Sequence, residues 1–500
     1  MRVAVVHGYF LGDSGSAIYA RELAREFAMQ GHDVTLVCQD QSPEKYDFID
    51  SAYDVDPKNF ELLEAFAREP LYSGCCRLAR PAIGDRMLTY VAGPFPPFEA
   101  APFQDAADEW IRSYGEMNAR SMAAIFGRWP QDLVQANHAV MQPWIVRQAL
   151  NGAAPYIVTI HGSELNFTVK KDPRMVPYML EGFEGAAVVA ALSETSREEV
   201  IGLADEHGLS ISKKTVILPP GVDTALFRPN PDRMKANPDR MKALTGLGIE
   251  LESQRDAASR HDVASDHHDI AVFAGRLLWT KGLHYAVAAL PLILQKRPHM
   301  QLVVVGDGPM RGPLEALIDA LEQGNLPAAM VLVAGEPNLQ YVQDYGPVIP
   351  GLEPEAEQLY VNSAKNNLKG RIHFTGHLPH ERLAPLFAAA DISLAPSVFP
   401  EAFGLVSIEA LAAGAIPVAT YQSGLRTPLD VVAGALSDDT IRELTPEGPL
   451  TAMIARSVIK ILEKYPTKEK GFREKLHTIA EREFSWATVA REYLDLGKLS

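Results

Sequence analysis

The sequence predicts an α/β protein made of two doubly wound domains that face one another across a cleft. Short apolar runs rich in β-branched residues alternate with helix-compatible segments, which is the pattern of a parallel sheet covered by helices. The pattern restarts after residues 217–229 (ILPPGVDTALFRP), where prolines and Gly221 interrupt both strand and helix. A chain of 500 residues is also longer than a single domain usually is.

The first domain opens with a strand, a helix and a second strand in residues 1–40. An apolar strand leads into a Gly- and Ser-rich turn, an amphipathic helix follows over about Ser16 to Gln30, and Gly31 ends it. Further strands are predicted at 156–162 (YIVTIHG) and 186–196 (AAVVAALSETS). Because these runs end in small or polar residues, we expect them to border a crevice at the carboxyl edge of a parallel sheet.

The second domain shows the same alternation of predicted strands and helices. Its apolar runs, each followed by turn residues, lie at 269–293, 301–309, 371–379 and 391–400. We expect the two domains to span residues 1–218 and 219–480, with a terminal amphipathic helix over 481–496 in a C-terminal segment, 481–500, that packs back on the first domain.

Two segments break the regular pattern, and their roles stay open. Residues 230–268 contain a tandem heptapeptide, NPDRMKA, and little apolar sequence, so a solvated loop is predicted there. Residues 324–369 show no repeating period and are predicted to form a loop with short helices.

Composition narrows the class of protein. A net charge of −16 argues against nucleic acid as a partner. The cysteines Cys38, Cys75 and Cys76 form neither a disulfide framework nor a zinc pattern, which is typical of a reducing compartment. No apolar run approaches the roughly 18 residues of a membrane-spanning helix, and the N-terminus lacks a signal-peptide pattern. We therefore expect a cytoplasmic protein without a transmembrane segment.

Two cations stand at a predicted strand-to-helix turn. Arg276 ends a strand, and Lys281 follows five residues later, just before Gly282. Such a turn offers fixed hydrogen-bond donors and a helix N-terminus to an anion. A diphosphate is the ligand that such a site is best suited to bind. The alternative is that both side chains are merely solvated on a loop.

Two carboxylates flank a Phe-Gly-Leu turn farther along the chain. Glu401 and Glu409 are eight residues apart, and the backbone N–H groups of 403–405 lie between them. Carboxylates accept hydrogen bonds from sugar hydroxyls, so the pair is suited to a ligand that carries two sugar rings. An exposed charge at the start of a helix is the alternative interpretation of Glu401.

The segment PEAFGLVSIEALAAGAIPVA (400–419) resembles the Glu-x7-Glu signature of retaining glycosyltransferases of family 4, which have the GT-B architecture of two Rossmann-like domains. Further landmarks of that family occur in the usual order, namely IHGSEL, PPGVD, GRLLWTKG, VVVGDGP and FTGHLPHERLAPLFAAADISLAPS. The family often has adjacent glycines in its first loop, whereas here Ser16 follows Gly15, which leaves the role of that loop open.

The resemblance implies a catalytic set and a donor-binding set. The catalytic set is His161, Arg276, Lys281 and Glu401. In it, the two cations would hold the donor diphosphate, Glu401 would bind sugar hydroxyls, and His161 would lie beside the anomeric centre. In the donor-binding set, Glu409 would hold the ribose and residues 376–378 would lie near the nucleobase. The set consists of Gly15, Gly376, His377, Leu378, Phe403, Gly404, Leu405 and Glu409. His138 is a candidate for binding the acceptor.

The resemblance further implies an enzyme that moves a hexose, with retention, from a nucleoside-diphosphate sugar to a soluble hydroxyl acceptor such as a sugar or sugar phosphate. UDP-glucose is the first candidate for the donor. No metal is required, because two cations already neutralise the phosphates, and Mg²⁺ is left open as a companion of the nucleotide. The acceptor and the oligomeric state also stay open.

Alternatives remain within and outside this class. Within it, the donor is GDP-mannose or the acceptor is a membrane lipid. Outside it, the first strand and Asp40 resemble an NAD-binding fingerprint, although the Gly-x-Gly-x-x-Gly spacing is missing. An NAD site would make the protein an oxidoreductase. A catalytically inactive sugar-nucleotide-binding protein would keep the same binding residues.

Overall fold

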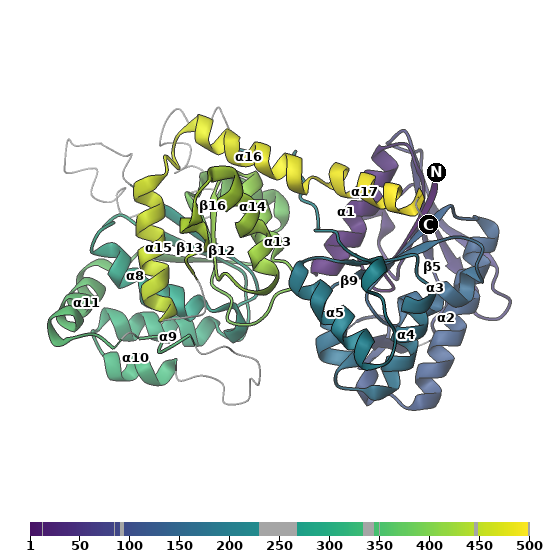
Figure 1. The fold of residues 1–500 in the computed structure, drawn as a ribbon, viewed down its shortest axis with the longest axis horizontal. Coiled ribbons are helices and arrows are strands. Elements are labelled where there is room, and N and C mark those ends of the chain that lie inside the picture. Colours follow the sequence, from purple (N-terminus) through teal and green to yellow (C-terminus); the bar gives the residue numbers. More distant parts are fainter. Residues whose placement is uncertain are drawn as a thin grey trace. The chain divides into compact units, whose positions relative to one another are not determined.

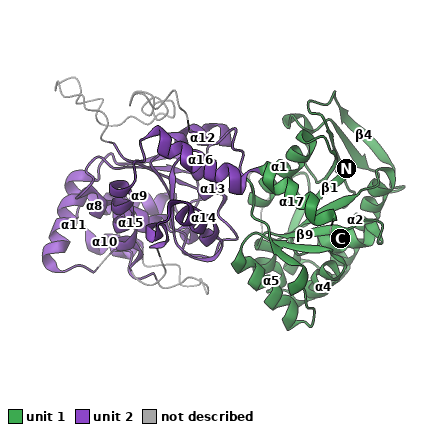
Figure 2. Cartoon of the chain, turned by 45° about the horizontal axis from the view of Figure 1, so that its top comes forward, with its two compact units in different colours: residues 1–221, 486–500 green, residues 222–485 purple. Residues whose placement is uncertain are grey.

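The computed structural model describes the whole chain except residues 13, 85, 91–94, 230–267, 334–344, 350, 445–448 and 499–500. Two compact units make up the described chain, one of residues 1–221 with 486–500 and the other of residues 222–485 (Figure 2). The loop predicted over 230–268 falls outside the described residues except at its last position. Within the described part, no helix is both long enough and apolar enough to cross a lipid bilayer.

Unit 1 is built on a nine-stranded sheet of order β11-β10-β9-β8-β1-β2-β5-β3-β4. All neighbouring strands are parallel except β3 and β4. The strands in the middle of the sheet are buried over nearly their whole length, as in parallel sheets whose two faces are covered by helices. The strands are β1 (Arg2–Val6), β2 (Asp33–Val37), β3 (Ser51–Val55), β4 (Leu62–Ala67), β5 (Cys75–Arg80), β8 (Leu133–Asn137), β9 (Tyr156–Ile160), β10 (Val188–Ala191) and β11 (Thr215–Ile217), with a separate pair β6 (Arg86–Thr89) and β7 (Glu99–Pro102).

The helices of unit 1 begin where the sequence signals them. The predicted first helix is confirmed as α1 (Gly15–Met29), with Ser14 as its N-cap accepting from the N–H of Ala17 at 3.3 Å. Gly31 follows it with a φ of 85°, a backbone conformation that favours glycine. The other helices are α2 (Asp108–Arg128), α3 (Gln142–Leu150), α4 (Val176–Gly185), α5 (Glu194–Glu206) and α17 (Trp486–Lys498).

The terminal helix predicted over 481–496 is present from Trp486 onward, but it is not continuous across Ser485. The structure has two helices, α16 (Lys470–Phe484) and α17, separated by Ser485, whose ψ of 144° is extended (Figure 1). Ser485 leaves the helical conformation because it forms a parallel β-bridge with Val222, whose N–H donates to the carbonyl of Phe484 at 2.7 Å. The chain then returns to unit 1, where α17 packs beside α1.

Unit 2 has a five-stranded parallel sheet of order β14-β13-β12-β15-β16. Figure 1 shows α15 beside α8 and α16 beside α13 around it. The strands are β12 (Ile270–Ala274), β13 (Gln301–Val305), β14 (Ile372–Gly376), β15 (Ile392–Ala395) and β16 (Ile416–Ala419). The helices are α8 (Leu283–Leu294), α9 (Arg311–Glu322), α10 (Leu326–Leu332), α11 (Pro354–Asn367), α12 (His380–Ala389), α13 (Leu405–Ala412), α14 (Arg426–Leu436), α15 (Leu450–Lys464) and α16.

The segment 324–369 contains more regular structure than the sequence predicted. Its helix α11 has 14 residues and packs on α8. Tyr360 donates its hydroxyl to the carbonyl of Ala288 at 2.9 Å, and Ser363 donates to Pro291 at 2.7 Å. The buried residues Tyr360 and Ala364 are one helical turn apart. A single turn is too short for hydrophobic periodicity to identify a helix.

A buried arginine joins the helices of unit 2. Arg473 on α16 is 2% exposed, and its guanidinium donates to the backbone carbonyls of Ala388 and Ala390 at 2.7 Å and of Ala413 at 3.1 Å. These carbonyls lie at the ends of α12 and α13, where helices leave acceptors without an internal partner. A cation at that position is also favoured by the helix dipole.

Replacing Arg473 should therefore destabilise unit 2. We expect Arg473→Met to lower the free energy of unfolding by about 3 kcal/mol, because several charge-assisted hydrogen bonds disappear and buried carbonyls lose their donors. Urea denaturation followed by circular dichroism measures it. Lys475→Met, at an exposed position of the same helix, is the control and should change little; equal stability of the two variants would contradict the role of Arg473.

Candidate active site

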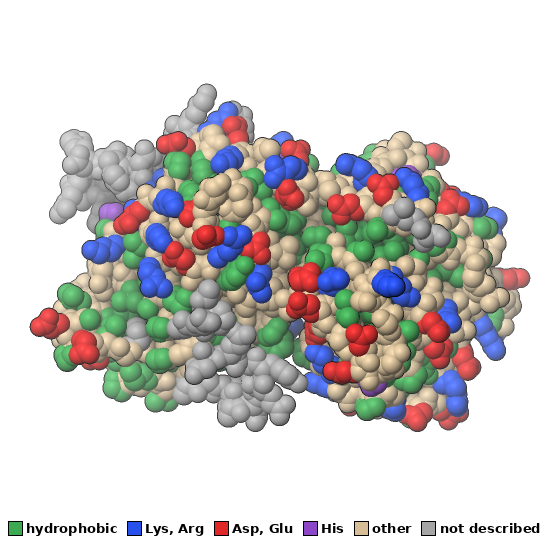
Figure 3. Space-filling view, in the orientation of Figure 1, with side chains coloured by type: hydrophobic (Ala, Val, Ile, Leu, Met, Phe, Trp, Pro, Cys, Tyr) green, Lys and Arg blue, Asp and Glu red, His purple; other side chains and the backbone are tan. Residues whose placement is uncertain are grey.

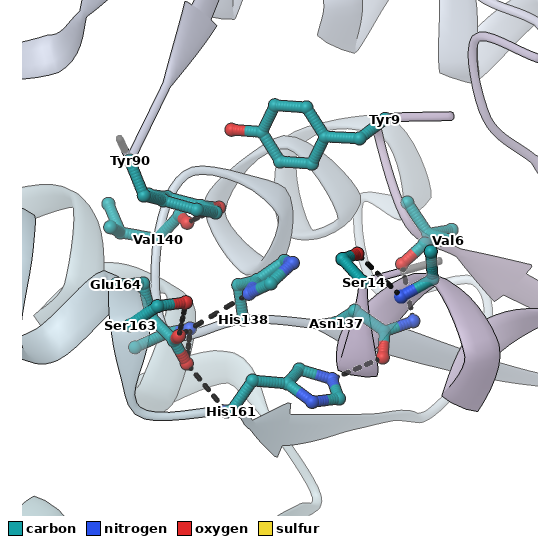
Figure 4. Close-up of polar contacts among 12 residues, drawn as sticks. Val6, Tyr9, Ser14, Tyr90, Asn137, His138, Val140, His161, Ser163 and Glu164 are labelled. Atoms are coloured by element: carbon teal, nitrogen blue, oxygen red, sulfur yellow. Dashed lines mark hydrogen bonds and ion pairs between the residues drawn. The ribbon is translucent and has the colours of Figure 1, made fainter. Parts of the chain in front are cut away.

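The ends of β8 and β9 in unit 1 bring together two of the predicted residues, His138 and His161 (Figure 4). The strands are parallel and pair Asn137 with Thr159, so the residues that follow each strand lie at the same edge of the sheet. The ring centroids of the two histidines are 4.9 Å apart. Both side chains are thus held at the carboxyl edge of the sheet, where α/β folds bind ligands.

A buried carboxylate holds this edge together. Glu164 is fully buried, and its Oε1 accepts from the N–H groups of His161 at 2.8 Å and Ala139 at 3.2 Å. Its Oε2 lies 3.3 Å from Nδ1 of His138. Burial alone would raise the pKa of Glu164, but the hydrogen bond and charge of His138, with the charge of His161, outweigh it and lower the pKa to about 2. Sequence reasoning did not single out Glu164, although it stands in the quoted motif IHGSEL.

His161 is neutral at physiological pH. Burial and the neighbouring His138 lower its pKa to about 3, against a smaller opposing effect of Glu164. Its Nε2 lies 2.7 Å from Oδ1 of Asn137, and its ring meets that of Tyr19 edge-on at 5.2 Å. The side chain remains partly exposed, so a ligand can reach it.

Aromatic rings surround His138. The centroid of Tyr90 lies 4.7 Å from its ring and that of Tyr9 lies 5.9 Å away, as Figure 4 shows. Tyr90 donates its hydroxyl to the carbonyl of Val140. Nε2 of His138 is buried and has no hydrogen-bond partner within the described parts of the chain. An unsatisfied buried nitrogen costs free energy, so this atom is a candidate contact for a ligand hydroxyl.

Gly15, the predicted contact in the first loop, is the first residue of α1. It precedes Tyr19, the ring that meets His161, by one helical turn. The first turn of α1 has backbone N–H groups without helical partners, which are suited to an anion or a hydroxyl.

In unit 2 the predicted residues gather at the carboxyl edge of the parallel sheet. Arg276 follows β12 and is exposed, Gly376 ends β14 with a φ of 73°, and Glu401 follows β15. His377 is exposed and Leu378 is buried, so the main chain of 378 rather than its side chain is available for contact. Figure 3 shows basic and acidic side chains interspersed over the face in view, with no extended basic surface there.

Lys281 and Glu401 form an ion pair at this edge, with Nζ and Oε1 2.8 Å apart. The carbonyl of Thr280 accepts from the N–H of Val398 at 2.9 Å, which ties the loop after β12 to the loop after β15. Gly282 ends the first loop with a φ of 67°, and a Cβ there would lie 1.8 Å from the carbonyl oxygen of Pro396. The close approach of the two loops therefore requires glycine.

Glu409 is buried in α13, behind the Phe-Gly-Leu turn. Its Oε1 lies 3.4 Å from Nε2 of His380, and burial raises its pKa while His380 opposes the rise. Gly404 is the N-cap of α13 with a φ of 91°, and Leu405 is the first helical residue. The Phe403 side chain is 2% exposed, which leaves its backbone as the part that a ligand can contact.

The sequence left two other chemistries open, a metal ion accompanying the nucleotide and an NAD site. No group of three or more His, Cys, Asp or Glu side chains suited to a metal ion occurs among the residues that are described. Asp40, on which the oxidoreductase alternative depends, is buried and accepts from Leu11 N–H at 3.0 Å, Ser42 N–H at 2.9 Å and the Tyr46 hydroxyl at 3.2 Å. This carboxylate is used inside the fold.

Comparison with known proteins identifies the family and the fold of the chain. The family described as glycosyl transferase 4-like domain matches residues 14–205, and glycosyl transferases group 1 matches residues 255–326 and 329–471. The 2-deoxystreptamine glucosyltransferase of Streptomyces kanamyceticus is 25% identical over 347 residues, which are 67% of this chain and 69% of that protein. The matched stretches of three curated relatives span 46%, 69% and 55% of those proteins' own length.

Solved structures share the fold over the whole chain. Sucrose-phosphate synthase from Thermosynechococcus elongatus has a TM-score of 0.59 and 19% identity, covering 100% of this chain and 98% of that one. Anabaena HepE in complex with UDP-glucose has a TM-score of 0.56 and 15% identity, covering 100% of both chains. Fold and family matches together define the class of this protein as a glycosyltransferase. The chain belongs to the glycosyltransferases of the GT-B fold, with a 4-like domain followed by a group 1 domain.

The neutral state of His161 should make stability depend on pH. Its pKa is about 3 in the fold and ordinarily 6.5, so the unfolded chain takes up the proton first as the pH falls below 6.5, and stability decreases. Between pH 7 and pH 5 we expect the wild type to lose about 2 kcal/mol more unfolding free energy than His161→Gln, from about 1.4 kcal/mol per pH unit.

Urea titrations at both pH values measure this difference. His207→Gln replaces an exposed histidine and should keep the full pH dependence of the wild type. Parallel losses in the wild type and His161→Gln would show that His161 takes up its proton at the same pH in the folded and unfolded chain.

Proposed function

We propose that the protein is a retaining glycosyltransferase that moves a hexose from a nucleoside-diphosphate sugar, with UDP-glucose as the first candidate, to a soluble hydroxyl acceptor such as a sugar or sugar phosphate. The observation that carries the proposal is the Lys281–Glu401 ion pair at the carboxyl edge of the sheet in unit 2, with the exposed Arg276 on the same loop as Lys281. Two cations and a carboxylate at one edge match a ligand that combines a diphosphate with a sugar.

The ion pair prepares the site for the donor. Without a ligand, Glu401 neutralises Lys281 and holds its ammonium group at the edge of the sheet. When a donor binds, the ammonium turns to the diphosphate and the carboxylate accepts hydrogen bonds from sugar hydroxyls. As negative charge builds on the leaving diphosphate, Arg276 and Lys281 stabilise the transition state more than the bound donor. This pair of cations also makes a metal unnecessary for neutralising the phosphates.

The remaining predicted residues take complementary roles. Glu409 accepts from the ribose hydroxyls, His161 contacts the transferred sugar, and His138 contacts the acceptor. Retention follows from the resemblance to family 4, with attack on the face from which the diphosphate leaves and a donor phosphate oxygen taking the acceptor proton. A neutral His161 suits a hydrogen bond to a sugar hydroxyl better than a charged role.

The choice of donor and acceptor has two supports. The fold is shared with a protein solved with UDP-glucose and with a sucrose-phosphate synthase, and a relative is named a glucosyltransferase. On α1, Arg21 and Arg25 both contact Glu22, at 2.8 Å and 3.5 Å, so these basic side chains are balanced rather than free to bind an anionic membrane. We therefore favour a soluble acceptor over a lipid.

A thermal-shift panel tests the donor class. UDP, GDP, ADP and NAD are added separately at the same large excess, and a ligand that binds the fold raises Tm by mass action. We expect UDP to raise Tm by several degrees and NAD to leave it unchanged. A shift with GDP alone would favour the mannose alternative, and a shift with NAD alone would contradict a glycosyltransferase.

Substitution of Lys281 tests the diphosphate role. We expect Lys281→Met to lower kcat/KM for the donor by about 100-fold or more, by analogy with the loss of one transition-state donor. The control is Lys296→Met, which removes an exposed lysine of the same unit and should leave kcat/KM unchanged. Turnover by Lys281→Met within about twofold of the wild type would refute this assignment.

A further inference from the structure

A chain of hydrogen bonds runs through the interior of unit 1 from His161 to the last helix. Its links are His161 Nε2 to Asn137 Oδ1 at 2.7 Å, Asn137 Nδ2 to Gln135 Oε1 at 2.9 Å, Gln135 Nε2 to Thr159 Oγ1 at 2.7 Å, Thr159 Oγ1 to the Tyr493 hydroxyl at 2.5 Å, and Tyr493 to the Tyr19 hydroxyl at 2.8 Å. The four central side chains are fully buried. Water therefore does not compete for these bonds.

A backbone carbonyl determines the orientation of the whole chain. Nδ2 of Asn137 lies 3.0 Å from the carbonyl oxygen of Val6, which Figure 4 shows beside it. A carbonyl only accepts, so the amide nitrogen of Asn137 must face Val6 and its oxygen must face His161. The Nε2 atom of neutral His161 must then carry the proton, and its Nδ1 keeps a free lone pair.

The same reasoning orients the other members. Asn137 donates its second amide hydrogen to Gln135, so the amide nitrogen of Gln135 must face Thr159. The hydroxyl of Thr159 accepts this bond and has Tyr493 as its other partner. Tyr493 comes from α17 at the C-terminal end of the chain, so the packing of α17 contributes to the order of the network.

We propose that Asn137 is a positioning residue for the glycosyl transfer, because it holds His161 as the Nε2–H tautomer and leaves Nδ1 to accept a hydrogen bond from a hydroxyl of the transferred sugar. Within the described residues, Nδ1 of His161 has no hydrogen-bond partner, as this role requires. The inference rests on the proposed function for the identity of the sugar, but the tautomer itself does not depend on a substrate.

The tautomer of His161 is directly measurable. Nitrogen-15 NMR of the ligand-free protein labelled at histidine distinguishes Nε2–H, Nδ1–H and doubly protonated rings, and the signals of His161→Gln identify the resonances by their absence. At pH 7 we expect Nε2–H for His161 in the wild type. A ring protonated at Nδ1 would overturn the proposal.

Variants of the chain test the positioning role. Asn137→Leu removes the acceptor of the His161 bond, so it should give a mixture of tautomers and a kcat lowered about tenfold, with the donor KM within about twofold. Tyr156→Phe is the control, because Tyr156 is also buried but donates to the carbonyl of Gly182 at 2.5 Å, outside the chain of hydrogen bonds. If Asn137→Leu and Tyr156→Phe gave the same spectrum and the same kcat, the proposal would fail.

A second pair of variants guards against misfolding. Thr159→Val keeps the shape of the side chain without its hydroxyl, whereas Thr159→Ser keeps the hydroxyl. Because the carbonyl of Val6 still orients Asn137 in both, we expect both variants to keep the Nε2–H tautomer and kcat. A change of tautomer in the valine variant alone would show that the hydroxyl chain rather than Asn137 selects the tautomer and would overturn the proposal. A protein with Nε2–H at His161 that transfers no sugar from any nucleotide would overturn the proposed function and would support the tautomer assignment.

Discussion

The buried carboxylate of Glu164 is the constraint on which the candidate site in unit 1 depends. Burying an ionised carboxylate costs several kcal/mol unless hydrogen bonds replace the lost water. Here the replacement comes from two backbone N–H groups, of Ala139 and His161, and from the ring of His138. Since these groups belong to the loops after β8 and β9, the charge can be satisfied only when both loops adopt this arrangement. The position of both histidines is therefore set by the solvation of one charge.

In unit 2, close backbone contacts rather than a buried charge hold the loops at the carboxyl edge of the sheet. There the loops after β12 and β15 approach so closely that a Cβ at Gly282 would lie 1.8 Å from a backbone oxygen. Likewise, the loop after β13 meets the loop after β12 where a Cβ at Gly306 would lie 1.9 Å from the carbonyl oxygen of Gly275. The charged side chains Lys281 and Glu401 are thus presented by backbone that has little freedom to move. Preorganised charge of this kind is what stabilises a transition state in which charge moves to a leaving group.

Membership of the GT-B glycosyltransferases defines the family and the fold, and in our proposal the side chains at the two sheet edges select donor and acceptor. At the edge in unit 1, the aromatic rings around His138 and its buried, unsatisfied Nε2 place an apolar face and a polar group side by side. In the same way, the buried Glu409 is a carboxylate whose protonation is influenced by a neighbour, the partly exposed His380.

Local patterns in the sequence determined the alternation of strands and helices and the restart of that alternation in a second half. They also determined the turns that carry Arg276, Lys281 and Glu401 and the helix that carries Glu409. These features depend on residues close together in the chain, so periodicity and turn chemistry predict them. Only the tertiary structure decided the break at Ser485, the partners of Glu164 and the tautomer of His161. The break needs Val222 as a strand partner, and the hydrogen bond between Thr159 and Tyr493 joins residues 334 positions apart. Which polar atoms of distant residues face one another depends on packing, and no local pattern in the chain encodes it.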